Sequence, residues 1–148
     1  MKPIKTIALL ACLSLLTTAR INAQHAVWQP IIAEFKNANL RGVAQVGDST
    51  IVAVGEYGTI VRSTDLGNDW RKFTHQPIGG GVTLLTSVDV FADNTCIAVG
   101  NSGAVARSQD EGKTWQVEKF GSELLTKIRC KDNLGIIVGE KGVILQST

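Results

Sequence analysis

The sequence contains few aromatic residues, prolines, histidines and cysteines. Of its 148 residues, 5% are aromatic, three are proline, two are histidine and three are cysteine. His25 and His75 form no close cluster with each other or with a cysteine, so no spacing typical of a zinc site is present. No motif predicts a cofactor either. Chemistry that depends on a metal or a cofactor is therefore not expected.

The sequence also lacks a hydrophobic run long enough to span a membrane as a helix. Residues 7–16 are apolar, whereas a spanning helix needs about 20 residues. A basic start (1–5) precedes this run and small residues follow it. This pattern predicts a signal peptide over 1–23, cleaved after Ala23 or, as a second choice, after Ala19. We therefore expect an exported protein, periplasmic or extracellular.

Two alternatives to cleavage by signal peptidase remain open. Residues 9–12 resemble a lipoprotein cleavage box that ends at Cys12. Residues 13–16 continue the apolar run, however, so lipidation would divide it. An uncleaved membrane anchor is the other alternative, and the run is short for that role.

A basic excess is missing from the predicted mature chain. The sequence has 15 Lys and Arg against 13 Asp and Glu, and Lys2, Lys5 and Arg20 precede the cleavage site, which leaves 15 − 3 = 12 basic residues. No acidic residue is removed, so the mature net charge is about −1. Without a basic excess the chain lacks the electrostatic footprint of nucleic-acid binding, and no nucleic-acid partner is expected.

Two cysteines, Cys96 and Cys130, remain after cleavage. Export permits a disulfide between them. They lie in different repeat units, in strands that need not be neighbours, so two buried free thiols fit the sequence at least as well.

The sequence does contain an internal repeat, which is the strongest indication of its fold. Residues 51–65 recur as 96–110, and a third copy covers 136–148. The shared glycines Gly55, Gly100 and Gly139 are 45 and then 39 residues apart. Further short strands are expected upstream (40–46, 85–91 and 125–131) and downstream of the first two copies (70–74 and 115–119).

Each repeat therefore predicts four short strands, which we name a, b, c and d. A four-stranded unit every 40 to 45 residues is typical of a β-propeller blade. The b–c turn reads Gly-x-x-Gly, and glycine accepts the positive φ of tight hairpins. We predict an all-β protein with about three blades, at 40–74, 85–119 and 125–148, in a repeat region over 24–148.

The c–d turn carries the motif S-x-D-x-G-x-x-W in the first two repeats. Its Ser and Asp side chains can accept hydrogen bonds from nearby backbone N–H groups, its Gly can adopt a left-handed conformation, and its Trp can pack under the hairpin. Because the motif recurs in each blade, we predict that its aspartates stabilise turns and do not act as catalytic acids. The motif residues are Ser63, Asp65, Gly67, Trp70, Ser108, Asp110, Gly112 and Trp115. Arg62 and Arg107, which precede the two motifs, are expected to serve each blade structurally.

These turns resemble the Asp-box (BNR) repeats of sialidases and other propellers. The longer pattern, which adds Val-Gly-x-x-Gly and Arg-Ser upstream, is more similar to the photosystem II stability/assembly factor family. The resemblance covers roughly 40–148. It implies a non-enzymatic propeller that binds a partner protein, of unidentified nature. The sequence departs from that family in having too few repeats for a ring and in a third copy without the Asp, Gly and Trp.

Three blades leave two open ends, which a closing arrangement could cover. Residues 26–31 include Trp28 and look like a d strand without its turn, so they could complete the third blade. Two chains could then form a homodimeric six-bladed ring by exchanging these strands. A truncated gene, or a fragment of a longer array, explains the same observation equally well.

Loops on a rigid scaffold are favoured places for binding. In an antiparallel meander the b–c and d–a connections lie on one side, and the c–d turns lie on the other. The long d–a connection at 75–82 would join this rim. Ordinary solvated turns are the alternative. The candidate binding rim consists of Glu56, Tyr57, Asn101, Ser102, Glu140 and Lys141.

A glycan-binding or sialidase-like protein is the competing function. A sialidase needs an arginine cluster and a tyrosine nucleophile with an acidic partner. Tyr57 is the only tyrosine, and no Arg-Ile-Pro motif precedes the first repeat. We therefore expect no catalytic residues, whereas glycan binding stays open because three tryptophans are present.

Overall fold

The computed structural model describes residues 28, 30, 39–72, 82 and 84–147. The chain divides into two compact units, Met1–Pro30 and Ile31–Thr148. The predicted signal peptide lies outside the described residues. Within the described part, no helix is long and apolar enough to cross a membrane.

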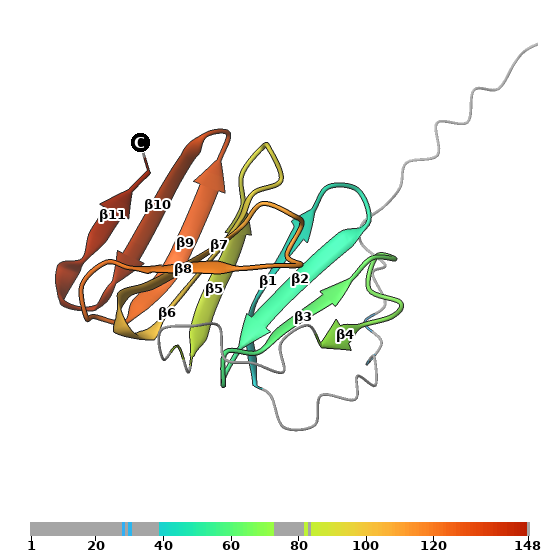
Figure 1. The fold of residues 1–148 in the computed structure, drawn as a ribbon, viewed down its shortest axis with the longest axis horizontal. Helices are drawn as coiled ribbons and strands as arrows, with labels where there is room; N and C mark the ends of the chain where they lie inside the picture. The colour runs from blue at the N-terminus through green and yellow to red at the C-terminus, as the bar shows by residue number, and fades with distance from the viewer. Residues whose placement is uncertain (1–27, 29, 31–38, 73–81, 83, 148) are drawn as a thin grey trace, which may run out of the picture. The chain divides into compact units, whose positions relative to one another are not determined.

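The second unit consists of three antiparallel sheets, each built from strands that follow one another in the chain (Figure 1). The first sheet contains β1 (Leu40–Val46), β2 (Thr50–Gly55), β3 (Ile60–Ser63) and β4 (Arg71–Lys72). The second contains β5 (Leu85–Val90), β6 (Cys96–Gly100), β7 (Ala104–Ser108) and β8 (Gln116–Lys119). The third contains β9 (Leu125–Lys131), β10 (Leu134–Gly139) and β11 (Ile144–Gln146). Two short 3₁₀ turns, η2 (Asn101–Gly103) and η3 (Glu140–Gly142), occupy the b–c connections of the second and third sheets.

This architecture confirms the predicted all-β fold with blade-like sheets. The predicted order a–b–c–d is the hydrogen-bonded order of strands in the first two sheets. The third sheet has three described strands, a to c. Of the segment 26–31, only Trp28 and Pro30 are described and neither lies in a strand, so its closing role stays a prediction.

The hydrophobic core lies between the sheets. We call the face of a sheet that points to the next sheet along the chain its front face, and the opposite face its rear face. Val52 and Val54 on the front face of the first sheet pack with Ala98 of the second. Val99, on the front face of the second sheet, packs with Ile128 of the third. Alternate side chains of each strand therefore serve different interfaces.

The central sheet is covered on both faces, which explains an apolar run in its sequence. Every residue of β6 is buried. Ala98 faces the first sheet, whereas Ile97 and Val99 face the third. A strand that is buried on both sides does not alternate between polar and apolar residues.

The two glycines of each Gly-x-x-Gly turn have different roles, and only the second has the positive φ expected of a tight hairpin. Gly58 and Gly103 do have positive φ, of 60° and 65°. Gly100, the first glycine of the second turn, is extended with φ −167°. A Cβ there would lie 1.9 Å from the carbonyl oxygen of Leu84. A register shift at the start of β5 brings that carbonyl close, so the first glycine provides space for backbone.

Candidate functional site

The b–c turns and the d–a connections lie side by side, as the meander predicts. The backbone N–H of Glu56 donates to Asn39 O (3.0 Å), and that of Asn101 donates to Leu84 O (3.1 Å). Glu140 makes the same bond to Leu124 O at 2.9 Å. Each b–c turn is thereby fixed to the residue that precedes strand a of its own sheet.

The turn tips share an unusual backbone. Tyr57, Ser102 and Lys141 occupy equivalent positions with φ of 57°, 56° and 54°. Each is followed by a glycine at positive φ, which is the pattern of a type I′ hairpin turn. A non-glycine residue pays a conformational cost in this region. Each tip presents one side chain from its sheet in this left-handed conformation.

Four of the six candidate rim side chains form hydrogen bonds within the protein. Glu56 accepts hydrogen bonds from Arg41 and, at 2.7 Å, from Asn39, and these bonds lower the pKa of its carboxyl. Asn101 Oδ1 accepts from the backbone N–H of Leu84 at 3.0 Å. These side chains brace the rim and are less available to a partner.

The third turn is braced in the same way. Lys141 Nζ lies 2.9 Å from Glu123 Oε2. This ion pair lowers the pKa of Glu123 and raises that of Lys141. Because both groups are at the surface, the pair contributes little to the stability of the fold.

Two aromatic side chains are exposed on the rim. Tyr57 is 72% exposed at the first turn tip. Phe120 is also exposed, and its backbone N–H donates to Gly103 O at 2.8 Å, which places it beside the second turn. Sequence reasoning missed Phe120 because nothing in the repeat pattern distinguishes the end of β8. Of the predicted d–a segment at 75–82, only Val82 is described, and it is buried.

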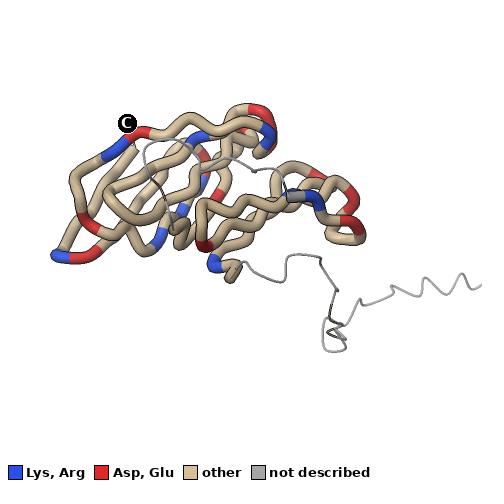
Figure 2. The backbone as a smooth tube through the Cα atoms, turned by 60° about the horizontal axis from the view of Figure 1, so that its bottom comes forward, with Lys and Arg blue, Asp and Glu red and all other residues tan. Residues whose placement is uncertain are grey.

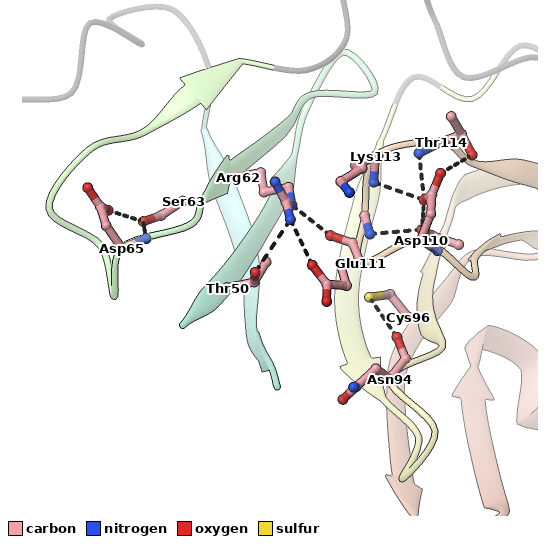
Figure 3. Close-up of polar contacts among 12 residues, drawn as sticks. Thr50, Arg62, Ser63, Asp65, Asn94, Cys96, Asp110, Glu111, Lys113 and Thr114 are labelled. Atoms are coloured by element: carbon pink, nitrogen blue, oxygen red, sulfur yellow. Dashed lines mark hydrogen bonds and ion pairs between the residues drawn. The ribbon is translucent and has the colours of Figure 1, made fainter. Parts of the chain in front are cut away.

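The Ser and Asp side chains of the two c–d turns bond within their own turns, and Figure 3 shows Ser63, Asp65 and Asp110 among them. Ser63 Oγ accepts from Gly67 N at 2.8 Å and donates to Asp65 Oδ1 at 2.7 Å. Asp65 Oδ1 also accepts from Asp69 N at 2.9 Å. Trp70 Nε1 donates to Gly67 O at 2.8 Å, and Gly67 has the left-handed φ of 92°.

The second c–d turn repeats this pattern and adds one bond. Ser108 Oγ accepts from Gly112 N at 2.8 Å and donates to Asp110 Oδ1 at 2.8 Å. Asp110 also accepts from Thr114 N at 2.8 Å and from Thr114 Oγ1 at 2.6 Å. Trp115 Nε1 donates to Gly112 O at 3.1 Å.

These bonds decide the ionisation of the two aspartates. Partial burial raises the pKa of Asp110, but the bonds from Thr114, Ser108 and Lys113 outweigh it and hold the pKa at about 2. The backbone N–H of Asp69 and the Ser63 hydroxyl lower the pKa of Asp65. A carboxylate that stays ionised to low pH is an acceptor and is poorly suited to donate a proton.

Arg62 connects the first sheet to the c–d turn of the second (Figure 3). The side chain is buried, and its Nε donates to Glu111 O at 2.8 Å. One terminal nitrogen lies 3.0 Å from Glu111 Oε2. Arg107, at the equivalent position of the second sheet, is exposed. The expected structural role is therefore seen at Arg62, whereas Arg107 has no corresponding turn of the third sheet within the described residues.

Cys96 and Cys130 are free thiols. Cys96 is buried and Cys130 is half-buried. Burial raises the pKa of each thiol to about 12. Both are therefore protonated and poorly nucleophilic at neutral pH.

The described residues present no metal-binding cluster. Lys and Arg positions are interspersed with Asp and Glu positions along the backbone (Figure 2). No group of three His, Cys, Asp or Glu side chains there could hold a metal ion.

Comparison with known proteins supports the fold. The sequence matches no family profile and no curated protein. A solved structure described as YCF48 bound to D1 peptide superimposes with a TM-score of 0.60 at 17% identity, over 80% of this chain and 39% of that one. The computationally designed Ika4 protein is similar with a TM-score of 0.49 at 13% identity, over 82% of this chain and 98% of that one. The chain thus has a propeller fold and spans about two fifths of the YCF48 structure.

Proposed function

We propose that this protein is an exported, non-enzymatic scaffold that binds a segment of a partner protein on its b–c rim, in the manner of an assembly factor. The observation that carries the proposal is the rim itself. Three left-handed turn tips are fixed to the backbone at the start of each sheet, and Tyr57 projects from the first of them. Preorganised loops with an exposed aromatic residue favour peptide binding because little entropy is lost on association.

Two further observations support a structural role for the c–d turns. Asp65 and Asp110 are surrounded by donors from their own turns. Trp70 and Trp115 are half-buried and their indole N–H groups bond within their own turns, which fits a structural role, whereas Trp28 is 93% exposed. The structural relative YCF48 was solved with a bound peptide, which fits binding of a polypeptide by this fold.

The binding test is affinity capture from an envelope fraction, with cross-linking to locate the contact. Tyr57→Asn removes the ring, and asparagine tolerates the left-handed turn. We expect this variant to lose at least about tenfold in affinity for the captured protein. Asp132→Asn is the matched control, since Asp132 is also left-handed (φ 54°) but lies in an a–b turn. Equal capture by Tyr57→Asn and the parent would contradict the rim as the binding site.

Export is tested separately by the mass of the protein recovered from the cell envelope or medium. We expect a chain that begins at Gln24, after cleavage behind Ala23. Recovery of the protein from the cytoplasm, with a mass that includes residues 1–23, would contradict export. A lipid-modified Cys12 would favour the lipoprotein alternative.

We also propose that the scaffold is a homodimer in which two chains of three sheets complete a six-bladed ring. A partial propeller leaves the faces of its terminal sheets without neighbours. A fragment of a longer propeller would bury the same faces within one chain, and the mass in solution distinguishes the two cases.

A further inference from the structure

The front face of the third sheet, opposite the face that packs on the second sheet, is open. Paired residues of neighbouring strands share a face, so three rows of side chains lie there, each with a base on β9 beside an aliphatic residue on β10. The rows are Lys127, Val138 and Ile144; Arg129, Ile136 and Gln146; and Lys131 and Leu134. All of these side chains are exposed except that of Ile136, which is half-buried. No described part of the chain therefore covers this face.

The apolar half of this face, on β10 and β11, is of a kind that is buried elsewhere in the chain. Val54 and Val99 are fully buried at the position that Val138 occupies, and Val138 is 39% exposed. Ile144 pairs with Val138 and is 70% exposed, whereas Ile60, its equivalent in the first sheet, is fully buried. Contiguous exposed apolar side chains of this kind mark an interaction surface.

The basic half, on β9, distinguishes this face from the two front faces that a sheet covers. Two strand-a positions hold small or acidic residues in the first and second sheets and bases in the third. They are Gly42, Ser87 and Lys127, and then Ala44, Asp89 and Arg129. Arg129 lies 3.6 Å from Asp89 Oδ2, whereas Lys127 and Lys131 make no ion pair with a described residue. The face therefore offers two lysine charges to an acidic occupant.

An occupant of this face must satisfy its own backbone. The N–H and C=O groups of β10 bond to β9 and β11 in the plane of the sheet, so none points to a segment that lies over the face. A helix meets this condition because its backbone groups bond within the helix. β10 has six residues, about 20 Å of strand, and a helix of about 13 residues matches that length.

A further sheet also satisfies its own backbone, but the bases disfavour it. At the first interface β1 approaches the second sheet so closely that a Cβ added at Gly42 would lie 3.0 Å from Ser87 Cα. Lys127 occupies the position of Gly42 in the third sheet. A long basic side chain obstructs the same close approach, whereas its stem can cover an apolar neighbour and its charge can reach an acid at the flank of a helix.

We infer that the front face of the third sheet binds an amphipathic helix of a partner protein. Aliphatic side chains of the helix lie over β10 and β11, and a row of Asp or Glu on one flank lies along the bases of β9. None of the residues of this face belongs to the candidate rim, so the inference does not depend on binding there. The proposed ring would place a sheet of a second copy on the same face, so the helix and the ring exclude each other.

The test is photo-cross-linking of the mature chain in an envelope fraction, with the photoreactive residue benzoylphenylalanine in place of Ile144. Mass spectrometry then identifies the cross-linked segment. We expect a segment of another protein in which aliphatic residues recur every three to four positions and Asp or Glu residues line one flank. The control carries the same cross-linker in place of Leu66, which is 60% exposed in a c–d turn of the first sheet, and should not capture that segment.

Charge reversal tests the basic half of the face. Lys127→Glu with Lys131→Glu should lower the yield of the cross-linked product at least about tenfold, because like charges then face each other. Lys113→Glu with Lys119→Glu is the matched control, since both lysines are exposed in the second repeat, and it should leave the yield unchanged. Circular dichroism verifies that each variant is folded.

Several results would overturn the inference. A cross-link to a peptide of this protein would assign the face to a second copy, and a cross-link to lipid would assign it to a membrane surface. A captured segment without the acidic flank, a yield that is indifferent to charge reversal on β9, or no product above the position-66 control would also refute it. Tyr57→Asn is measured in the same assay and should leave the yield unchanged, so failure of the rim proposal and failure of this inference are separate results.

Discussion

At Gly100 the backbone that precedes β5 leaves no room for a side chain. Its backbone is extended, but the carbonyl oxygen of Leu84 occupies the space that a side chain would need. We expect Gly100→Ala to lower the free energy of unfolding by about 3 kcal/mol, because either β5 or the b–c turn must move. Chemical denaturation measures this change.

Gly142→Ala is the control for that substitution. Gly142 has φ 76° and open space around the position of a Cβ. The cost there is conformational only, about 1 kcal/mol. Equal losses in the two variants would show that close approach of the Leu84 carbonyl is not the constraint.

Asp110 should make stability depend on pH in the acid range. Its pKa is about 2 in the folded chain and 3.8 as an ordinary aspartate, so its contribution is complete above pH 3.8 and is lost as the pH falls toward 2. We expect Asp110→Asn to lower the free energy of unfolding at pH 7 by about 2 kcal/mol, since several hydrogen bonds to a charged acceptor are weakened. Denaturation at a series of pH values tests both statements. An unchanged acid dependence in Asp110→Asn would refute the assignment.

Among the strands and turns, the Arg62 bridge gives the sharpest comparison, because the chain contains its own control. Arg62→Ala removes a buried side chain that bonds to Glu111 in the next sheet, and we expect a loss of about 2 kcal/mol. Arg107→Ala removes an exposed residue at the equivalent position, and we expect a change within about 0.5 kcal/mol. Thermal unfolding of the two variants measures the difference, and similar losses would contradict a specific bridging role.

The strands themselves could be predicted because the repeat displays each of them more than once. Leu40–Val46 and Leu125–Lys131 were expected as strands with the observed bounds. The two glycines of the turn could not be told apart, because the role of Gly100 depends on a carbonyl that comes 16 residues earlier. The pairing of Arg62 with Glu111 spans 49 residues and crosses between sheets, so no local pattern contains it.

The candidate site was predicted in outline and not in its details. Alternation of strand direction was enough to place the b–c turns beside the d–a connections. It did not reveal that Glu56 and Lys141 are engaged by Arg41 and Glu123, because ion pairs depend on side-chain geometry. Phe120 was missed because nothing in the repeat pattern distinguishes the end of β8.

For the molecule as a whole, the stacking of sheets predicts the order of local stability. β6 has a strand on each side and a sheet on each face, and all its residues are buried. β11 is an edge strand among the described residues, and two of its three residues are exposed. We therefore expect backbone amides of β6 to exchange with deuterium at least about tenfold more slowly than those of β11. Faster exchange in β6 would contradict the three-sheet arrangement.

Two glycines fix the backbone of each b–c hairpin, so the backbone conformation does not depend on which residues lie between them. In every repeat the first glycine makes room for a backbone carbonyl and the second completes the turn, so only two residues between them are left to vary. Those two residues are Glu-Tyr, Asn-Ser and Glu-Lys in the three repeats. Each sheet thus presents two variable residues on a backbone frame that is the same in all three repeats. If the proposed rim binds a partner, such a frame would let these two residues change, in a laboratory or by mutation over time, without refolding the protein around them.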